Sequence, residues 1–89
     1  MLYAFICTDK PGNLPIRKAN RDAHLAYLKE TAAVHAGPFV NEDGEMIGSL
    51  VVVDLADRAA AQDWAANDPY AKAGLFEKVR IEAWNKVIG

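Results

Sequence analysis

Two segments of the sequence predict β-strands that are apolar on both faces. They are residues 2–8 and 45–55, where apolar side chains fill successive positions instead of every second one. The opposed sets are Leu2, Ala4 and Ile6 against Tyr3, Phe5 and Cys7 in the first strand, and Leu50 and Val52 against Val51 and Val53 in the second. Because successive side chains of a strand point to opposite sides of its sheet, a sheet built from these strands needs a cover on each side.

Turn signals divide the first half of the chain. The Asp-Lys-Pro-Gly-Asn cluster at residues 9–13 ends the first strand. Residues 15–33 predict a helix, because helix formers dominate and apolar residues recur at helical spacing. Residues 33–40 contain Gly-Pro and predict a brief edge strand, where proline costs no ladder hydrogen bond. The Asn-Glu-Asp-Gly segment at residues 41–44 predicts a hairpin turn into the strand at 45–55.

Caps and alternation define the second half of the chain. Asp57 predicts the N-cap of a helix over residues 58–67. Asp68, which precedes a proline, predicts a second cap and a short helix that Gly74 ends. Residues 79–87 alternate in polarity and predict the last strand. The resulting β-α-β-β-α-β order is that of an α+β ferredoxin-like sandwich, in which helices cover one face of a four-stranded antiparallel sheet.

A chain of this length has few residues with which to cover both faces of its own sheet. Its 89 residues make a single domain, residues 1–89, and 52% of them are hydrophobic, which predicts a folded core. Two short helices cover one face, and an uncovered apolar face in water is an association site. We therefore expect a homodimer, or a higher oligomer, that forms through the second face. The alternative is that extra loops cover this face, but few residues remain for them.

Charge and composition exclude several classes of function. The formal net charge of −2 has the wrong sign for sequence-independent nucleic-acid binding. The longest apolar run, Leu50–Val53, is far shorter than the ~20 residues of a membrane span, and the N-terminus lacks the pattern of a signal peptide. We therefore expect a cytoplasmic protein that binds neither nucleic acid nor a membrane. The sequence also lacks Gly-rich phosphate loops and metal-ligand spacing, which predicts no cofactor and no metal.

His24 is the first residue that could carry chemistry. Arg21 lies three residues before it on the predicted helix, so the two side chains share one side, and Arg17 extends this line by a further turn. A histidine exchanges protons near neutral pH, and a neighbouring arginine can hold an anionic substrate. This arrangement is typical of a general base. A surface histidine on a basic turn of helix is the competing interpretation.

Asp68 also has two interpretations, and they are compatible. Aspartate before proline is the pattern of a helix N-cap, which needs no catalysis to explain it. One carboxylate oxygen could cap the helix while the other orients an imidazole. The distance between Asp68 and His24 in the fold decides between a cap alone and a catalytic pair.

The other polar and aromatic candidates are less specific. Ser49 follows Gly48 in a strand, where its hydroxyl either binds substrate or fills the strand, and no Gly-x-Ser-x-Gly elbow makes it a nucleophile. Cys7 is expected to be buried and inert, because it has no basic neighbour in the sequence. His35 is expected to be structural or exposed. Trp64 is expected in the core, and a pocket or a dimer face is expected to be lined by Tyr3, Phe5 and Trp84.

Short motifs follow one another along nearly the whole chain. They are Arg21-Asp22-Ala23-His24-Leu25-Ala26-Tyr27-Leu28, Ala36-Gly37-Pro38, Gly48-Ser49, Asp68-Pro69-Tyr70 and Gly74-Leu75. No single motif is specific, but in this order and spacing they resemble the YciI-like (YCII-related) family. The resemblance implies a dimeric ferredoxin-like α+β barrel, which agrees with the separate expectation from the two-faced sheet.

The resemblance also implies a site and a class of chemistry. Members of the family carry a His and an Asp that are proposed as an active-site pair, and these map onto His24 and Asp68. Arg21, Ser49 and Tyr70 fall in the same motifs and are the implied substrate-binding residues. Some members are linked to dehydrochlorination of hydroxyquinone-type rings, and muconolactone isomerases belong to the wider barrel group. We therefore expect a cofactor-free lyase or isomerase that acts on a small anionic or enolisable ring. The alternative is a non-catalytic dimer that binds a small molecule.

Overall fold

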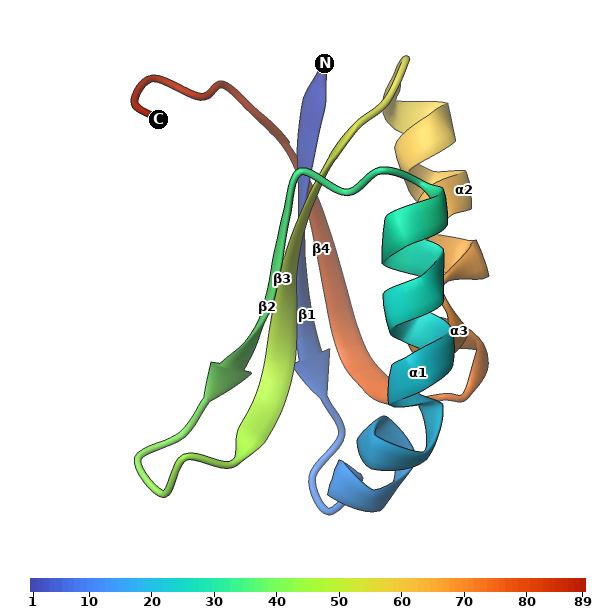
Figure 1. Ribbon diagram of the computed structural model, residues 1–89, viewed down its shortest axis with the longest axis vertical. Coiled ribbons are helices and arrows are strands. Elements are labelled where there is room, and N and C mark those ends of the chain that lie inside the picture. The colour runs from blue at the N-terminus through green and yellow to red at the C-terminus, as the bar shows by residue number, and fades with distance from the viewer.

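A four-stranded antiparallel sheet with all of its helices on one side makes up the chain (Figure 1). The computed structural model describes residues 1–89. The predicted β-α-β-β-α-β order is confirmed, with two consecutive helices in the place of the second one. The elements are β1 (Leu2–Asp9), α1 (Leu14–Glu30), β2 (His35–Val40), β3 (Met46–Asp54), α2 (Arg58–Asn67), α3 (Pro69–Lys72) and β4 (Phe76–Trp84). None of the helices is both long and apolar enough to cross a membrane.

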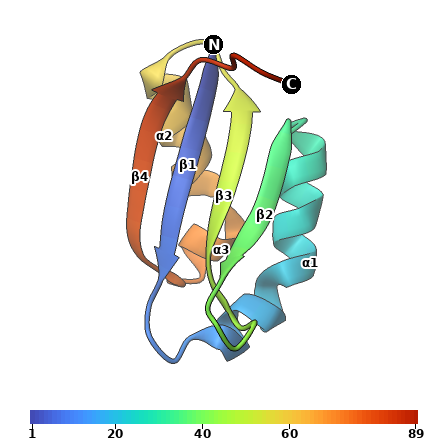
Figure 2. The same ribbon diagram turned by 90° about the vertical axis from the view of Figure 1, so that its left-hand side faces the viewer.

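The strands lie in the order β2-β3-β1-β4, so the two strands that are apolar on both faces occupy the centre (Figure 2). Phe5 of β1 pairs with Val51 of β3 on one side and with Ile81 of β4 on the other. The expected edge position of β2 is confirmed, since this strand pairs only with β3. Pro38 therefore lies in an edge strand, where a missing N–H leaves the rest of the ladder intact.

The core lies between the sheet and the helices. Phe5 packs its ring 4.5 Å from the ring of Trp64 on α2, which confirms the expected core position of the tryptophan. The expectation that Tyr3 and Phe5 line a pocket or a dimer face is wrong, because both are buried in this core. Their position on β1 turns them towards the helices, together with Cys7, Val51 and Val53. Trp84 lies on the opposite face and is 40% exposed.

The helices leave the opposite face of the sheet open, and only the segment after β4 crosses the upper end of that face (Figures 1 and 2). Its exposed apolar residues include Phe39 on β2, Leu50 on β3 and Trp84 on β4. Between the two edge strands, Ile6 pairs with Leu50 on one side and with Arg80 on the other. This face is therefore apolar on β1, β2 and β3, whereas β4 carries charged side chains such as Arg80 beside the apolar Trp84.

The predicted end of the first helix and both predicted ends of the last strand are wrong. The helix predicted to reach residue 33 ends at Glu30, because Ala32 adopts a left-handed backbone with φ of 55° and the Ala33 N–H turns back to the Leu28 carbonyl. The last strand starts at Phe76 rather than 79 and ends at Trp84 rather than 87. The only neighbour of β4 is β1, and their pairing stops where Leu2 meets Trp84, so residues 85–89 have no strand to pair with.

Candidate active site

His24 and Asp68 form a buried pair where α1 packs against α3. His24 lies on the buried face of α1, and Asp68 lies at the junction where α2 ends and α3 begins. Their side chains are separated by 2.8 Å, measured from His24 Nδ1 to Asp68 Oδ1, and each residue is at most 5% exposed. The interpretation of His24 as a surface histidine is therefore wrong. The two residues that the family resemblance singles out are in direct contact.

Asp68 caps a helix and holds the imidazole with the same oxygen atom. Its Oδ1 accepts a hydrogen bond from the backbone N–H of Tyr70 at 3.0 Å, which caps α3. The same Oδ1 contacts His24 Nδ1. The expectation of two compatible roles is met, although we expected the two roles to use different oxygens. Because one atom contacts both groups, the start of α3 and the imidazole ring are held in a fixed position relative to each other.

The contact with Asp68 determines the tautomer of His24. An ionised carboxylate has no hydrogen to donate, so Asp68 Oδ1 accepts from the imidazole as it does from the Tyr70 N–H. His24 Nδ1 therefore carries the hydrogen. The second ring nitrogen, Nε2, is then left with a lone pair. It makes no hydrogen bond to another protein group, and the His24 side chain lines a cavity. Nε2 is therefore the atom of this pair that can accept a proton from a ligand.

Tyr70 packs flat against the imidazole. The ring centroids of Tyr70 and His24 are 3.9 Å apart with an interplanar angle of 16°, and the Arg17 guanidinium lies 4.7 Å from the Tyr70 centroid. Burial raises the pKa of the Tyr70 hydroxyl, and the positive charges of Arg17 and Arg21 oppose that rise. Tyr70 thus fixes the plane of the imidazole by stacking, with a cation near the same ring.

Arg17 also lines the cavity of His24. From the sequence we expected only that it lies on the same side of the helix as Arg21 and His24. It is 2% exposed and donates two hydrogen bonds to Asp9, from Nε at 2.7 Å and from Nη2 at 2.8 Å. Nη2 also donates to Ser49 Oγ at 2.8 Å. Burial acts to lower the pKa of Arg17, but the hydrogen bonds and charge of Asp9 outweigh it and raise that pKa. Asp9 was expected only in a turn, because nothing local shows that it faces Arg17.

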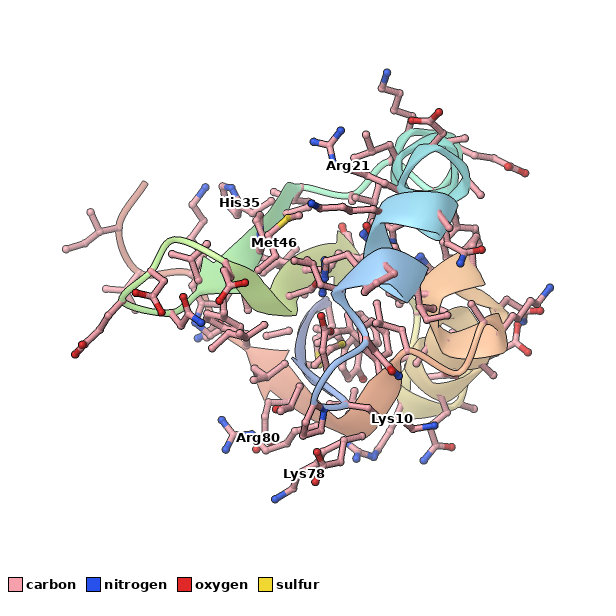
Figure 3. The ribbon with its side chains drawn as sticks, turned by 90° about the horizontal axis from the view of Figure 1, so that it is seen from below. Lys10, Arg21, His35, Met46, Lys78 and Arg80 are labelled. Carbon is pink, nitrogen blue, oxygen red and sulfur yellow. The ribbon has the colours of Figure 1, made fainter.

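The site residues surround a cavity of about 160 Å³ between α1 and the β2–β3 hairpin. Leu25 and Leu28 of α1 form one wall, and the predicted Ala36–Pro38 edge forms another. Arg21 is exposed at this cavity and makes no ion pair. Figure 3 shows Arg21 on the side of the molecule opposite Lys78 and Arg80. The cavity is lined by Arg17, Arg21, His24, Leu25, Leu28, Ala36, Gly37, Pro38, Met46, Ser49 and Tyr70.

Gly48 lets Ser49 reach this cavity. A Cβ atom at position 48 would overlap the backbone carbonyl oxygen of Cys7 on the neighbouring strand. Glycine therefore allows β3 to approach β1 closely at the residue before Ser49. The other sequence candidate, His35, is exposed on β2 and does not line the cavity of His24, as expected for a residue without a partner.

Cys7 is buried, as expected. Burial raises the pKa of its thiol from 9.0 to about 12. The negative charge of Asp68 adds to this rise, and the positive charge of Arg17 opposes it. Between pH 9 and 12 the folded chain thus holds a proton that the unfolded chain has lost, so stability falls as pH rises through this window. We expect Cys7→Ala to flatten the alkaline loss of unfolding free energy, by at most about 4 kcal/mol at the upper end. Urea unfolding at several pH values from 8 to 11 measures this. Parallel pH profiles for the two proteins would contradict it.

Comparison with known proteins places this arrangement in a family. The sequence profile described as the YCII-related domain matches residues 1–85. The chain belongs to the YCII-related family. Its relatives include an uncharacterized protein of Haemophilus influenzae, 37% identical, and Protein YciI of Escherichia coli, 36% identical. Each alignment covers 98% of this YCII-related chain and 99% of the relative.

A solved structure also resembles this YCII-related protein over nearly all of its length. It is the 5-chloro-2-hydroxyhydroquinone dehydrochlorinase TftG of Burkholderia phenoliruptrix, in complex with 2,5-dihydroxybenzoquinone. The two proteins are 33% identical with a TM-score of 0.87, over 96% of this chain and 94% of the other. This structural neighbour is thus a dehydrochlorinase that acts on a small ring compound.

Proposed function

We propose that this YCII-related protein is a small enzyme that moves a proton on an anionic or enolisable ring compound without a cofactor. His24 is the general base and acid, Asp68 orients it, and Arg21 attracts the anionic substrate. The reaction is of the lyase or isomerase type. The observation that carries the proposal is the buried His24–Asp68 pair, which leaves Nε2 as a free acceptor at a cavity.

The position of Asp68 favours proton transfer by His24. When Nε2 takes a proton, the imidazole becomes positively charged, and a buried carboxylate 2.8 Å from Nδ1 stabilises that charge. The ring does not need to reorganise, because stacking on Tyr70 and the hydrogen bond to Asp68 already hold it. Preorganisation of this kind is what lets an enzyme lower the barrier of a proton transfer.

The dimensions and charge of the cavity favour a single-ring substrate. A volume of about 160 Å³ is close to that of a cavity that accommodates one benzene ring, about 150 Å³. The unpaired guanidinium of Arg21 favours an anion. The compound bound to the dehydrochlorinase, 2,5-dihydroxybenzoquinone, is a single ring with acidic hydroxyls. This compound is therefore a suitable guide to the chemical class of the substrate.

The proposed transfer needs no oxidant. His24 Nε2 takes the proton of a ring hydroxyl, whose electron pair forms a carbonyl as a ring carbon takes a proton back from the imidazolium. An isomerase stops at this keto form. In a lyase the protonated carbon also carries a leaving group such as chloride, which departs with its bonding electrons while a second hydroxyl loses its proton. The sum is loss of HCl.

The proposal is tested with 5-chloro-2-hydroxyhydroquinone in deuterated water. We expect the protein to release chloride faster than a protein-free blank, and mass spectrometry to find deuterium on the carbon that lost the chlorine. The unchlorinated ring triol tests the isomerase branch, through deuterium exchange of its ring hydrogens. If both compounds bind and are recovered without deuterium or chloride loss, the protein is a ligand-binding dimer and the enzymatic proposal is wrong.

We also infer that the protein works as a homodimer that forms through the uncovered sheet face. The support is the exposed apolar set on that face, Phe39, Leu50 and Trp84. A single chain exposes these side chains to water, and burying them against a second copy removes their apolar surface from it.

A charge in the middle of this face is expected to separate the dimer. Leu50→Glu would place a carboxylate among apolar side chains, and we expect the sedimenting mass to fall from twice 9.7 kDa to 9.7 kDa. Gln62→Glu is the matched control, because it adds the same charge on the exposed surface of α2. A wild-type protein that sediments as a monomer at micromolar concentration would contradict the inference.

A further inference from the structure

We propose that Asp9 and Arg17 are positioning residues that turn the Ser49 hydroxyl into a hydrogen-bond donor for an anionic oxygen on the substrate ring. This inference rests on the proposed function and narrows its substrate class. Asp9 of β1, Arg17 of α1 and Ser49 of β3 are joined by short hydrogen bonds.

Arg17 is held in place by Asp9, Ser49 and Tyr70. Two of its nitrogens donate to the two oxygens of Asp9, in a bidentate pair that is nearly completely buried. Its guanidinium also lies over the Tyr70 ring. A planar guanidinium held at both edges and on one face presents a fixed hydrogen-bond direction. Its charge is balanced by Asp9, so attraction of an anion is left to Arg21.

The hydrogen bond between Arg17 and Ser49 has only one possible direction. Arginine has only donors, so in the 2.8 Å contact between Arg17 Nη2 and Ser49 Oγ the serine oxygen is the acceptor. The hydroxyl hydrogen of Ser49 must then point elsewhere. No protein group accepts it, and Ser49 is 3% exposed and lines the cavity. A buried donor without a protein acceptor is therefore directed into the cavity.

A ligand of the cavity must match its pattern of hydrogen-bond donor, hydrogen-bond acceptor and charge. The cavity presents a donor at Ser49 Oγ, an acceptor at His24 Nε2 and a cation at Arg21. A complementary ring has an ionised oxygen for Ser49 and an acidic hydroxyl for His24. Singly ionised hydroxyquinones and ring diols have this pattern, whereas a ring that carries only donors does not. The charge that develops on the oxygen during proton transfer strengthens the Ser49 contact.

The test is a double-mutant cycle with 2,5-dihydroxybenzoquinone as the probe, whose binding is followed by calorimetry over a pH series that spans its single and double ionisation. We expect Ser49→Ala to raise Kd by about 10- to 100-fold, the range for a hydrogen bond to a charged group. Asp9→Asn is expected to raise Kd by about 3- to 10-fold, because Arg17 loses its anchor. In the Ser49→Ala background, Asp9→Asn should have no further effect.

Controls separate positioning from a general loss of structure. Asp22→Asn removes an exposed carboxylate of α1 that makes no hydrogen bond, and it should leave Kd unchanged. If Asp9→Asn fails to fold, Asp9→Glu keeps the ion pair and takes its place, with a smaller loss that must also vanish in the Ser49→Ala background. Ser49→Ala is a small change and decides the donor role by itself.

The outcomes are distinct from those of the proposed function. Equal Kd values for the wild type and Ser49→Ala, or no binding of the probe to the wild type at millimolar concentration, would overturn the donor role. An Asp9 effect that persists without the Ser49 hydroxyl would overturn the positioning role. Serine-dependent binding without any chloride release or deuterium exchange would refute the enzyme and leave this inference standing.

Discussion

Replacing His24 with glutamine is expected to lower kcat by about 10² to 10⁴-fold, the usual contribution of a positioned general base. Glutamine suits this test because its amide N–H can donate to Asp68, as His24 Nδ1 does, so the buried carboxylate keeps a partner. The amide has no nitrogen that takes up a proton in this pH range. Chloride release and deuterium incorporation at saturating substrate measure the loss.

The molecule contains its own control for this substitution. His35→Gln makes the same chemical change on β2, where the histidine is exposed and lies outside the cavity of His24. It should retain full activity. The general-base role of His24 would be wrong if His24→Gln turned over a confirmed substrate at a rate within a few-fold of the wild type.

The second large effect on activity is expected from substitutions of Asp68. Two substitutions separate its contribution to activity from its contribution to stability. In Asp68→Asn one amide oxygen can still accept from both Tyr70 and His24, because a single oxygen serves both in the native protein. The fold should then be nearly as stable, while kcat falls by about 10²-fold or more, because the charge that stabilises the imidazolium is gone. The imidazole nitrogen chemical shifts in NMR report whether Nδ1 keeps its hydrogen.

Asp68→Ala is expected to lose stability as well as activity. The helix cap to Tyr70 contributes about 1 kcal/mol, and a buried His24 without its partner costs a further 1 to 3 kcal/mol. The unfolding free energy in urea should therefore fall by about 2 to 4 kcal/mol. Asp57→Ala is the matched control, because Asp57 caps α2 through Ala60 at an exposed position. If Asp68→Ala cost no more than Asp57→Ala and left kcat unchanged, Asp68 would be a cap only.

Local patterns in the sequence predicted most of the architecture. The Pro-Gly cluster after β1, the aspartate caps of α2 and α3 and the Asp-Gly turn before β3 are short-range signals, and each marks an element boundary found in the structure. Boundaries that depend on a distant partner were predicted less well. The end of β4 is set by the extent of β1, which lies at the other end of the chain.

The residues of the candidate site also differ in whether the sequence could reveal them. His24 and Asp68 could be paired from the sequence because their motifs resemble a family in which such a pair is proposed. Arg17 could have been found by its position seven residues before His24, on the same side of the helix as Arg21. Asp9 could not, because its contact with Arg17 depends on how the loop after β1 brings the start of α1 back over the sheet.

The sequence alone determined the order of elements, the apolar character of both faces of two strands, and the residue types available for proton transfer. These follow from side-chain period, turn chemistry and composition, which act over a few residues. Only the tertiary structure decided that Asp68 uses one oxygen for both the cap and the imidazole, that Tyr3 and Phe5 face the helices, and that Arg17 is locked by Asp9. Hydrogen bonds depend on distances of tenths of an ångström between groups that the chain brings together only when the helices pack on the sheet.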